Sequence, residues 1–139
     1  MISLLYRAAD ALRRRSYRDN HGRIGEDLAH RYLRSRGCTV VARNYHTRSG
    51  WGEIDLVAWH GNTLAFVEVK TRQSADFGEP EAAVDSEKQG LLIRAAREYS
   101  RRTGIEWEKT RFDVVSIVLR NPPIIEWIQD AFGTAPRTL

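Results

Sequence analysis

Cysteine is nearly absent from this chain of 139 residues, because Cys38 is the only one. A single thiol excludes an intramolecular disulfide, and the four histidines show no paired spacing with it that suggests zinc. Long hydrophobic runs are also lacking, since none approaches the ~20 apolar residues of a membrane-spanning helix. No secretory signal with a cleavage site is recognisable. The sequence therefore predicts a cytoplasmic protein with no membrane partner.

Positive charge is scarce outside the N-terminal segment, although the whole chain has a net charge of +4. Residues 1–20 carry five arginines against two aspartates, which leaves the remainder nearly neutral. Basic composition is therefore a weak argument for nucleic-acid binding by the main domain. The length suits one hydrophobic core, so we expect a single domain over residues 21–130 and a C-terminal tail over residues 131–139.

The first twenty residues predict a basic N-terminal helical extension. Apolar residues recur there at helical spacing, with arginines between and after them: Ile2, Leu5, Ala8, Ala9 and Leu12. Two interpretations are about equally supported, namely a partly ordered appendage and an arm that contacts DNA or a partner. Attachment to a membrane surface is a weaker third interpretation.

Apolar periodicity and turn signals predict the element order αβββαββ in the main domain. The expected elements are a helix over Gly22–Arg36, strands over Thr39–Tyr45, Glu53–Trp59 and Thr63–Thr71, a helix over Ser86–Arg102, and strands over Arg111–Leu119 and Ile124–Ile128. A loop is expected over Gln73–Val84, which contains Gly78 and Pro80. This order indicates an α/β fold with a mixed β-sheet flanked by helices.

Four charged residues are expected to converge at one end of a hairpin. A two-residue turn at Gly61-Asn62 fixes a register in which Asp55 faces Glu68, and Glu53 faces Lys70 on the same side. Two carboxylates with Cβ atoms ~5 Å apart repel each other unless a cation lies between them. The opposite side should be buried, because all of its residues are apolar: Ile54, Leu56, Ala58, Ala65, Val67 and Val69.

Two interpretations of this charged end are about equally supported by spacing alone. One is a Mg²⁺ site, because this ion prefers a few carboxylate oxygens together with water and phosphate oxygens. The other is a solvated cluster of cross-strand charges, in which each pair contributes under ~1 kcal/mol. A turn one residue longer or shorter would put Asp55 and Glu68 on opposite sides and remove the site.

The hairpin carries two motifs that resemble the PD-(D/E)xK nuclease superfamily, which has the restriction-endonuclease-like fold. They are Gly52-Glu53-Ile54-Asp55-Leu56-Val57 and Phe66-Val67-Glu68-Val69-Lys70-Thr71-Arg72. The chain more closely resembles the YraN family of uncharacterised bacterial proteins, described as endonuclease-like and distantly similar to archaeal Holliday-junction resolvases. This likeness covers about residues 22–119 and includes Gly25-Glu26-Asp27-Leu28-Ala29, Arg43-Asn44-Tyr45, Phe77-Gly78, Ala83-Val84 and Lys88-Gln89.

The resemblance implies a metal site that binds Mg²⁺ or Mn²⁺. Asp55 and Glu68 would be the side-chain ligands, and the backbone carbonyl of Val69 would be a third ligand. Lys70 would be the catalytic lysine that orients the attacking water. The proline of the family motif is replaced by Ile54, a departure that costs little for metal binding if Ile54 faces the core.

Glu26 and Gln89 match polar residues that approach the site in resolvase-like members, and the resemblance therefore implies a catalytic role for both. Each also has a structural explanation. A glutamate in the first turns of a helix interacts favourably with the helix dipole. Gln89 lies three residues after Ser86, which is the spacing of a capping box.

The activity that the resemblance implies is metal-assisted hydrolysis of phosphodiester bonds by a DNA endonuclease, and the likeness to resolvases implies an enzyme that selects DNA by its structure. Arg43, Arg48 and Arg72 near the strand ends are candidates for phosphate contacts, and Trp51 for stacking on an unpaired base, although residues of these types are more often simply surface residues. One alternative is a non-catalytic nucleic-acid-binding accessory protein that retains the nuclease fold. Another is a protein-interaction module that uses residues 1–20. DNA is the expected partner, and the sequence leaves open whether the protein forms a homodimer.

Overall fold

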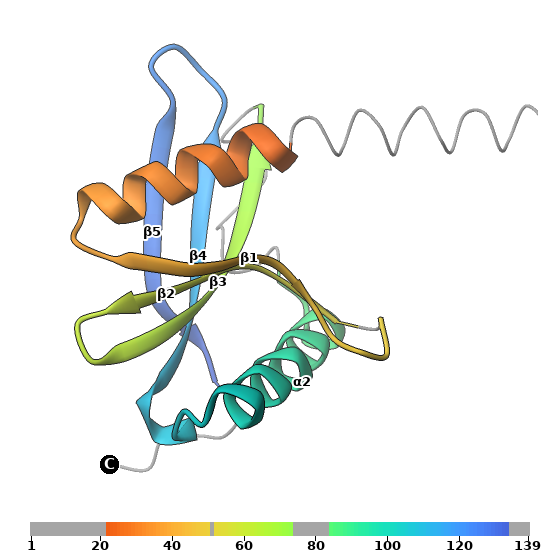
Figure 1. Cartoon of the computed structure of the whole chain (residues 1–139). Coiled ribbons are helices and arrows are strands. Elements are labelled where there is room, and N and C mark those ends of the chain that lie inside the picture. Colours follow the sequence, from red (N-terminus) through yellow and green to blue (C-terminus); the bar gives the residue numbers. More distant parts are fainter. Residues whose placement is uncertain (1–21, 51, 74–83, 134–139) are drawn as a thin grey trace, which may run out of the picture.

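The computed structural model describes residues 22–50, 52–73 and 84–133 (Figure 1). The predicted N-terminal extension, Trp51, the C-terminal residues 134–139 and residues 74–83 of the predicted loop lie outside this described part. The described chain forms one five-stranded sheet with two longer helices packed against it. It is therefore the mixed α/β architecture that the sequence predicts.

The strands follow one another across the sheet in the order β1-β2-β3-β4-β5. The pair β3–β4 is parallel, and α2 connects its two strands, whereas the other neighbouring strands of this sheet are antiparallel. The elements are a helix at residues 22–35, β1 (Thr39–His46), β2 (Glu53–His60), β3 (Thr63–Arg72), α2 (Ser86–Thr103), a 3₁₀ helix (Trp107–Lys109), β4 (Thr110–Val118) and β5 (Ile124–Phe132). The predicted order αβββαββ is confirmed.

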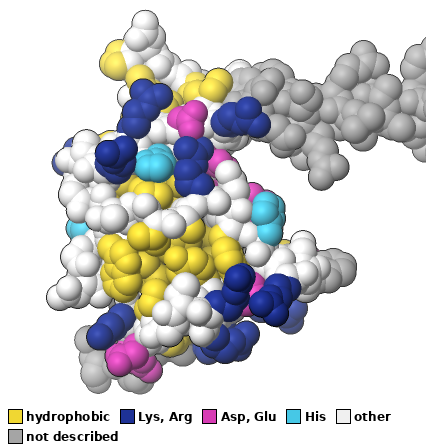
Figure 2. Space-filling model, viewed as in Figure 1, with side chains coloured by type: hydrophobic (Ala, Val, Ile, Leu, Met, Phe, Trp, Pro, Cys, Tyr) yellow, Lys and Arg dark blue, Asp and Glu magenta, His cyan; other side chains and the backbone are white. Residues whose placement is uncertain are grey.

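Two hydrophobic clusters hold the helices on the sheet. Leu92, Ala95 and Ala96 of α2 pack with one set of strand residues, among them Phe66. Ala29 and Leu33 of the 22–35 helix pack with a separate set, which includes Leu56, Ala58, Ala65, Val67, Val115 and Ile117. Seen from one side, further apolar side chains reach the surface in the space between the two helices (Figure 2). The sheet is therefore buried on both sides, as the composition of its strands predicts.

The position of Ile54 differs from the prediction, because it packs in the α2 cluster and not beside Leu56. Its partner on β1, Tyr45, packs against the same α2 cluster, and so does Ala42 three residues earlier. Asn44 between them has a φ of 50°, a conformation that interrupts the regular alternation of side chains along a strand. The side chains of Ile54 and Leu56 therefore pack on opposite sides of the sheet, although the two residues are two apart in β2.

The predicted register of the β2–β3 hairpin is confirmed over its regular part. Facing pairs run from His60–Thr63 at the turn to Leu56–Val67. Asp55 and Glu68 follow directly after the last of these pairs, and the two strands separate there. The ladder therefore ends at the point where the charged residues begin, which leaves backbone groups of β3 free to bind side chains.

The ends of two other elements also differ from the prediction. The N-cap of α2 is Asp85, whose Oδ1 accepts a hydrogen bond from the backbone N–H of Lys88 at 2.9 Å. The expected capping box of Ser86 with Gln89 is therefore wrong by one residue, because an aspartate caps at least as well as a serine. β5 continues four residues past the expected end, because the buried Asp113 on β4 accepts a hydrogen bond from the backbone N–H of Asp130.

Gly25 allows the 22–35 helix to lie directly against the end of β3. A Cβ atom added at Gly25 would overlap the hydroxyl of Thr71 and lie 3.1 Å from its Cβ. We expect Gly25→Ala to lower the free energy of unfolding by about 1–3 kcal/mol, because the helix must shift away from the sheet. Urea denaturation measures this change. Gly22→Ala is the matched control, since its Cβ would meet nothing within 4 Å; equal stability of the two variants would contradict the prediction.

Candidate active site

Asp55 and Glu68 lie together where β2 and β3 separate. Oδ2 of Asp55 accepts a hydrogen bond from the backbone N–H of Val69 at 2.8 Å, and the Asp55 carboxyl group lies close enough to Glu68 for the charge of Glu68 to raise its pKa. Glu68 is 5% exposed, and Asp55 is half-buried. The Asp55 side chain thus accepts the β3 hydrogen bond that a backbone carbonyl of β2 would otherwise accept. This contact brings the two carboxyl groups side by side.

The backbone of Val69 faces the same place. Val69 lies beyond the last β2–β3 pair, and its N–H points to Asp55. The N–H and C=O of one strand residue point to the same side of the strand, so the Val69 carbonyl is directed toward this gap as well. Two carboxyl groups and one carbonyl group are therefore available on one side of β3.

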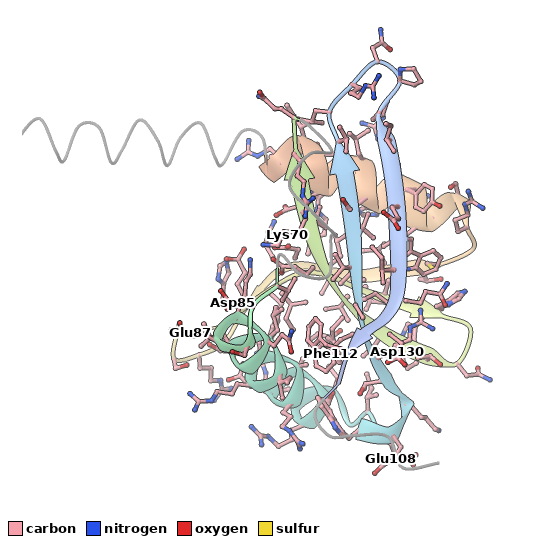
Figure 3. All side chains as sticks on the ribbon, turned by 180° about the vertical axis from the view of Figure 1, so that it is seen from behind. Lys70, Asp85, Glu87, Glu108, Phe112 and Asp130 are labelled. Carbon is pink, nitrogen blue, oxygen red and sulfur yellow. The ribbon has the colours of Figure 1, made fainter. Side chains whose placement is uncertain are left out.

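Two lysines converge on the same oxygen of Glu68. Nζ of Lys88, from the first turn of α2, is 2.5 Å from Oε1, and Nζ of Lys70 is 3.5 Å from it. Figure 3 shows Lys70 on β3 next to the beginning of α2, where Asp85 is labelled. Sequence reasoning assigned no role to Lys88. The available signal was the pair Lys88-Gln89, which is one of the segments that resemble the YraN family.

The electrostatics of the cluster follow from burial and from the close spacing of like charges. Burial, and then the charge of Glu68, raises the pKa of Asp55 well above its usual value. Burial, and then the neighbouring Lys88, lowers the pKa of Lys70. Burial is the largest single influence on Lys88 and acts to lower its pKa, but the charge of Glu68 and the hydrogen bond to it, with smaller contributions from Lys70 and Asp55, together raise the pKa. The site holds two carboxyl groups that disfavour joint ionisation, with an ammonium group closely bound to one of them.

We expect Asp55→Asn to stabilise the metal-free protein at neutral pH. Because the pKa of Asp55 is raised on folding, the folded state binds this proton more tightly than the unfolded state, and stability is lost as pH rises above the unfolded value. Asparagine carries no charge and keeps an oxygen for the Val69 N–H. The expected gain at pH 7 is at least about 1 kcal/mol, and it should vanish below about pH 4, where aspartate is protonated in both states.

Urea denaturation in EDTA at the two pH values measures this gain. The control is Glu126→Gln, which removes an exposed carboxylate on β5 and should give the same small change at both pH values. A loss of stability in Asp55→Asn at neutral pH would show that the aspartate charge supports the folded state.

Glu26 lies near the pair without joining it. Its Oε2 is 3.7 Å from Nη2 of Arg43, which is also 2.8 Å from Oδ1 of Asp27. Burial is the main cause that raises the pKa of Glu26, and the charge of Glu26 contributes to the raised pKa of Asp55. No group of three or more His, Cys, Asp and Glu side chains suited to a metal ion is found in the described residues.

The other predicted site residues have varied surroundings. Nε2 of Gln89 donates a hydrogen bond to the carbonyl of Val84 at 2.8 Å, which links the first turn of α2 to the residue just before its N-cap. Arg43 is held by the two carboxylates of the 22–35 helix, Arg48 is exposed, and Arg72 is half-buried at the end of β3. Trp51 lies outside the described residues. The catalytic and DNA-binding roles of these residues stay predictions.

The mixed five-stranded sheet, flanked by helices and carrying Asp55, Glu68 and Lys70 on one hairpin, defines an α/β protein of restriction-endonuclease-like architecture. Residues 25–117 match the model of the uncharacterised protein family UPF0102. The chain belongs to this family, also called YraN, and the predicted family relationship is confirmed. The helices in the described part of the chain are too short or too polar to cross a membrane.

The similarity to individual family members extends over most of the chain. A UPF0102 protein of Solibacter usitatus is 67% identical over 132 residues, which cover 95% of this chain and 100% of the relative. A UPF0102 protein of Koribacter versatilis is 46% identical over 112 residues, covering 80% and 78% of the two chains. One of Rhodococcus jostii is 46% identical over 113 residues, covering 80% and 94%.

Proposed function

We propose that this protein is a metal-dependent DNA endonuclease of the PD-(D/E)xK type. The observation that carries the proposal is the convergence of Asp55, Glu68 and Lys70 beside the open end of the β2–β3 ladder. Solvated surface charges have no need of burial, yet Glu68 is 5% exposed and Asp55 has a strongly raised pKa. Retaining such a costly arrangement is typical of a functional site.

The residues present fit a hard divalent cation. The donors that face the gap are all oxygens, from Asp55, Glu68 and the Val69 carbonyl, which is the ligand chemistry of Mg²⁺ and Mn²⁺. The raised pKa of Asp55 also supports a cation site, because two adjacent carboxylates ionise together more easily when a cation lies between them. When bound, the ion would polarise the phosphoryl oxygen and lower the pKa of a coordinated water.

The residues around the ion would then have separate roles in the hydrolysis. Asp55 and Glu68 would hold the ion, with the Asp55 carboxylate oriented by its hydrogen bond from Val69. Lys70 would orient the attacking water and stabilise the negative charge that develops on the phosphate. The lowered pKa of Lys70 favours a role in proton transfer, since burial makes the ammonium easier to deprotonate.

The surface beside the site offers positive charge for a DNA backbone. The outer side of α2 exposes a row of arginines at helical spacing: Arg94, Arg97 and Arg101. Figure 2 shows Lys and Arg side chains gathered on the part of the surface around α2. Contacts from such side chains to phosphates give affinity without sequence preference. This property favours a nuclease that selects DNA by structure, such as a flap or a four-way junction.

A non-catalytic nucleic-acid-binding protein is the second candidate. The observation that favours it is the ion pair between Lys88 and Glu68, which neutralises one carboxylate without a metal. A protein that keeps the fold but no longer cuts DNA could retain its charged cluster in this form. Binding of DNA without cleavage at any metal concentration would support this candidate.

The test is cleavage of plasmid, flap and four-way-junction DNA in the presence of Mg²⁺ or Mn²⁺. We expect metal-dependent cleavage by the wild-type protein and its loss in Glu68→Gln. Glu126→Gln, on an exposed position of β5, should cut like the wild type. Thermal denaturation of each variant confirms that the fold is retained. Cleavage by Glu68→Gln at the wild-type rate would reject this site.

A further inference from the structure

When both carboxyl groups are ionised, as they must be to hold a cation, the charged cluster is already close to electrically neutral without the ion. Two carboxyl groups, Asp55 and Glu68, are matched by two lysines, Lys70 and Lys88. A divalent cation placed between the carboxylates would add two positive charges to a partly buried cluster that already contains two ammonium groups. Such an excess is unfavourable at short range in a medium less polar than water. One lysine must therefore move away, or an anion must arrive.

Lys88 is the lysine that is positioned to move. Its Nζ is closer than that of Lys70 to Oε1 of Glu68, at 2.5 Å against 3.5 Å, so it is the more direct competitor for this oxygen. Its side chain is also the more exposed, at 42% against 22%. Lys70 lies on β3, the central strand of the sheet, whereas Lys88 lies in the first turn of α2.

We propose that Lys88 is a positioning residue that exchanges between Glu68 in the metal-free protein and a phosphate group of the DNA in the loaded protein. This inference rests on the proposed function. Lys88 leaves Glu68 when a divalent cation binds the carboxylates, and its ammonium group then pairs with the phosphodiester anion. Metal and DNA therefore bind cooperatively, since each removes an unfavourable charge left by the other. Metal bound in the absence of DNA is correspondingly weak.

Mn²⁺ binding provides a test that does not depend on catalysis. The affinity is measured by the electron paramagnetic resonance signal of free Mn²⁺, with and without a phosphorothioate DNA duplex that keeps the backbone charge and resists hydrolysis. In the wild type we expect the duplex to tighten Mn²⁺ binding by at least about 10-fold. In Lys88→Gln we expect Mn²⁺ to bind about 5-fold or more tighter than in the wild type without DNA, and the effect of the duplex to fall below about 3-fold.

Two further variants separate charge from position. Lys88→Arg keeps the positive charge and should keep most of the coupling. Lys109→Gln makes the same chemical change as Lys88→Gln at an exposed lysine near the other end of β4, and it should behave as the wild type. The backbone hydrogen bond from residue 88 to Asp85 is retained in both Lys88 variants, so the beginning of α2 is preserved.

The outcomes distinguish this inference from the proposed function. Equal Mn²⁺ affinity in the wild type and Lys88→Gln, with an equal effect of the duplex, overturns the exchange of Lys88 and leaves the metal site intact. Weaker Mn²⁺ binding in Lys88→Gln also overturns it, because Lys88 would then support the ion and not compete with it. Absence of Mn²⁺ binding in every variant, with or without DNA, overturns both proposals. Coupled binding without cleavage supports the exchange and rejects the endonuclease.

Discussion

Replacing Asp113 by alanine is expected to lower the free energy of unfolding by about 3–5 kcal/mol, the usual cost of removing one partner from a buried ion pair. Asp113 on β4 is fully buried, and Arg111 binds both of its oxygens at 2.8 Å. Its Oδ2 also accepts from Nε1 of Trp127 at 3.0 Å, and its Oδ1 accepts from the backbone N–H of Asp130 at 2.9 Å. Alanine would remove the acceptor of all of these donors, and Nη2 of Arg111 would keep only its contact with Nδ1 of His60 at 3.0 Å.

The substitution should also weaken the pairing of the end of β5 with β4, because Asp113 lies where the β4–β5 register shifts. The facing pairs on either side of it are Phe112–Phe132 and Val114–Ile128, so β5 has extra residues at this point. Asp130 has a φ of 55°, and its N–H is held by the Asp113 carboxylate. This contact keeps β5 paired beyond the bulge, which explains why the strand continues past its expected end at Ile128.

Urea denaturation of Asp113→Ala at neutral pH measures the loss. Glu126→Gln is the control on the neighbouring strand, and it should change the free energy of unfolding by less than about 0.5 kcal/mol because Glu126 is exposed. Hydrogen exchange should show faster opening of the amides after Ile128 than of those in β3. A loss below about 1 kcal/mol would mean that the cluster contributes little net stability, as some buried ion pairs do.

Lys70→Met is expected to lower the rate of metal-dependent DNA cleavage by about 10²–10⁴-fold, the range seen when a positioned proton-transfer or charge-stabilising group is removed. The Lys70 side chain is 22% exposed, and its Nζ is 3.5 Å from Glu68, next to the proposed metal position. Methionine has a similar length and no charge. The remaining groups, Asp55 and Glu68, would still hold a metal ion, so the protein should retain Mn²⁺ binding while it loses turnover.

Single-turnover cleavage with saturating protein measures this change without interference from DNA binding. Lys109→Met is the matched control, because Lys109 is 59% exposed and lies near the start of β4, whereas Lys70 pairs with Ser116 further along it. The two positions are separated by roughly 20 Å of strand, at about 3.3 Å per residue. A Lys70→Met protein that cuts at the wild-type rate would exclude Lys70 from the reaction.

The two charged clusters of this fold differ in completeness, and this difference separates a structural role from a functional one. The Asp113 carboxylate receives four hydrogen bonds from Arg111, Trp127 and Asp130, which leaves no acceptor capacity for a ligand. At the other cluster, Asp55 accepts a hydrogen bond from the backbone N–H of Val69, and its pKa is raised. The Asp55 carboxylate thus keeps acceptor capacity that Asp113 lacks, and this capacity suits it to bind a cation.

Local sequence signals were sufficient for the fold class and for the centre of the site. Apolar periodicity gave the order of helices and strands, because each element buries residues at its own repeat. The turn at Gly61-Asn62 gave the register of β2 and β3, because a two-residue loop allows one pairing of the strands. The juxtaposition of Asp55 and Glu68 follows from that register, although their strands separate at this point and the side chain of Asp55 completes the contact.

Only the tertiary structure decided which other residues join or leave this site. α2 connects the parallel strands β3 and β4. Lys88 reaches Glu68 because the first turn of α2 lies beside the open end of the β2–β3 hairpin. Glu26 is bound to Arg43 of β1, and this contact depends on how closely the 22–35 helix approaches the sheet. Such contacts join residues that are far apart in the sequence. Their geometry is set by helix packing, for which neither periodicity nor turn chemistry provides a signal.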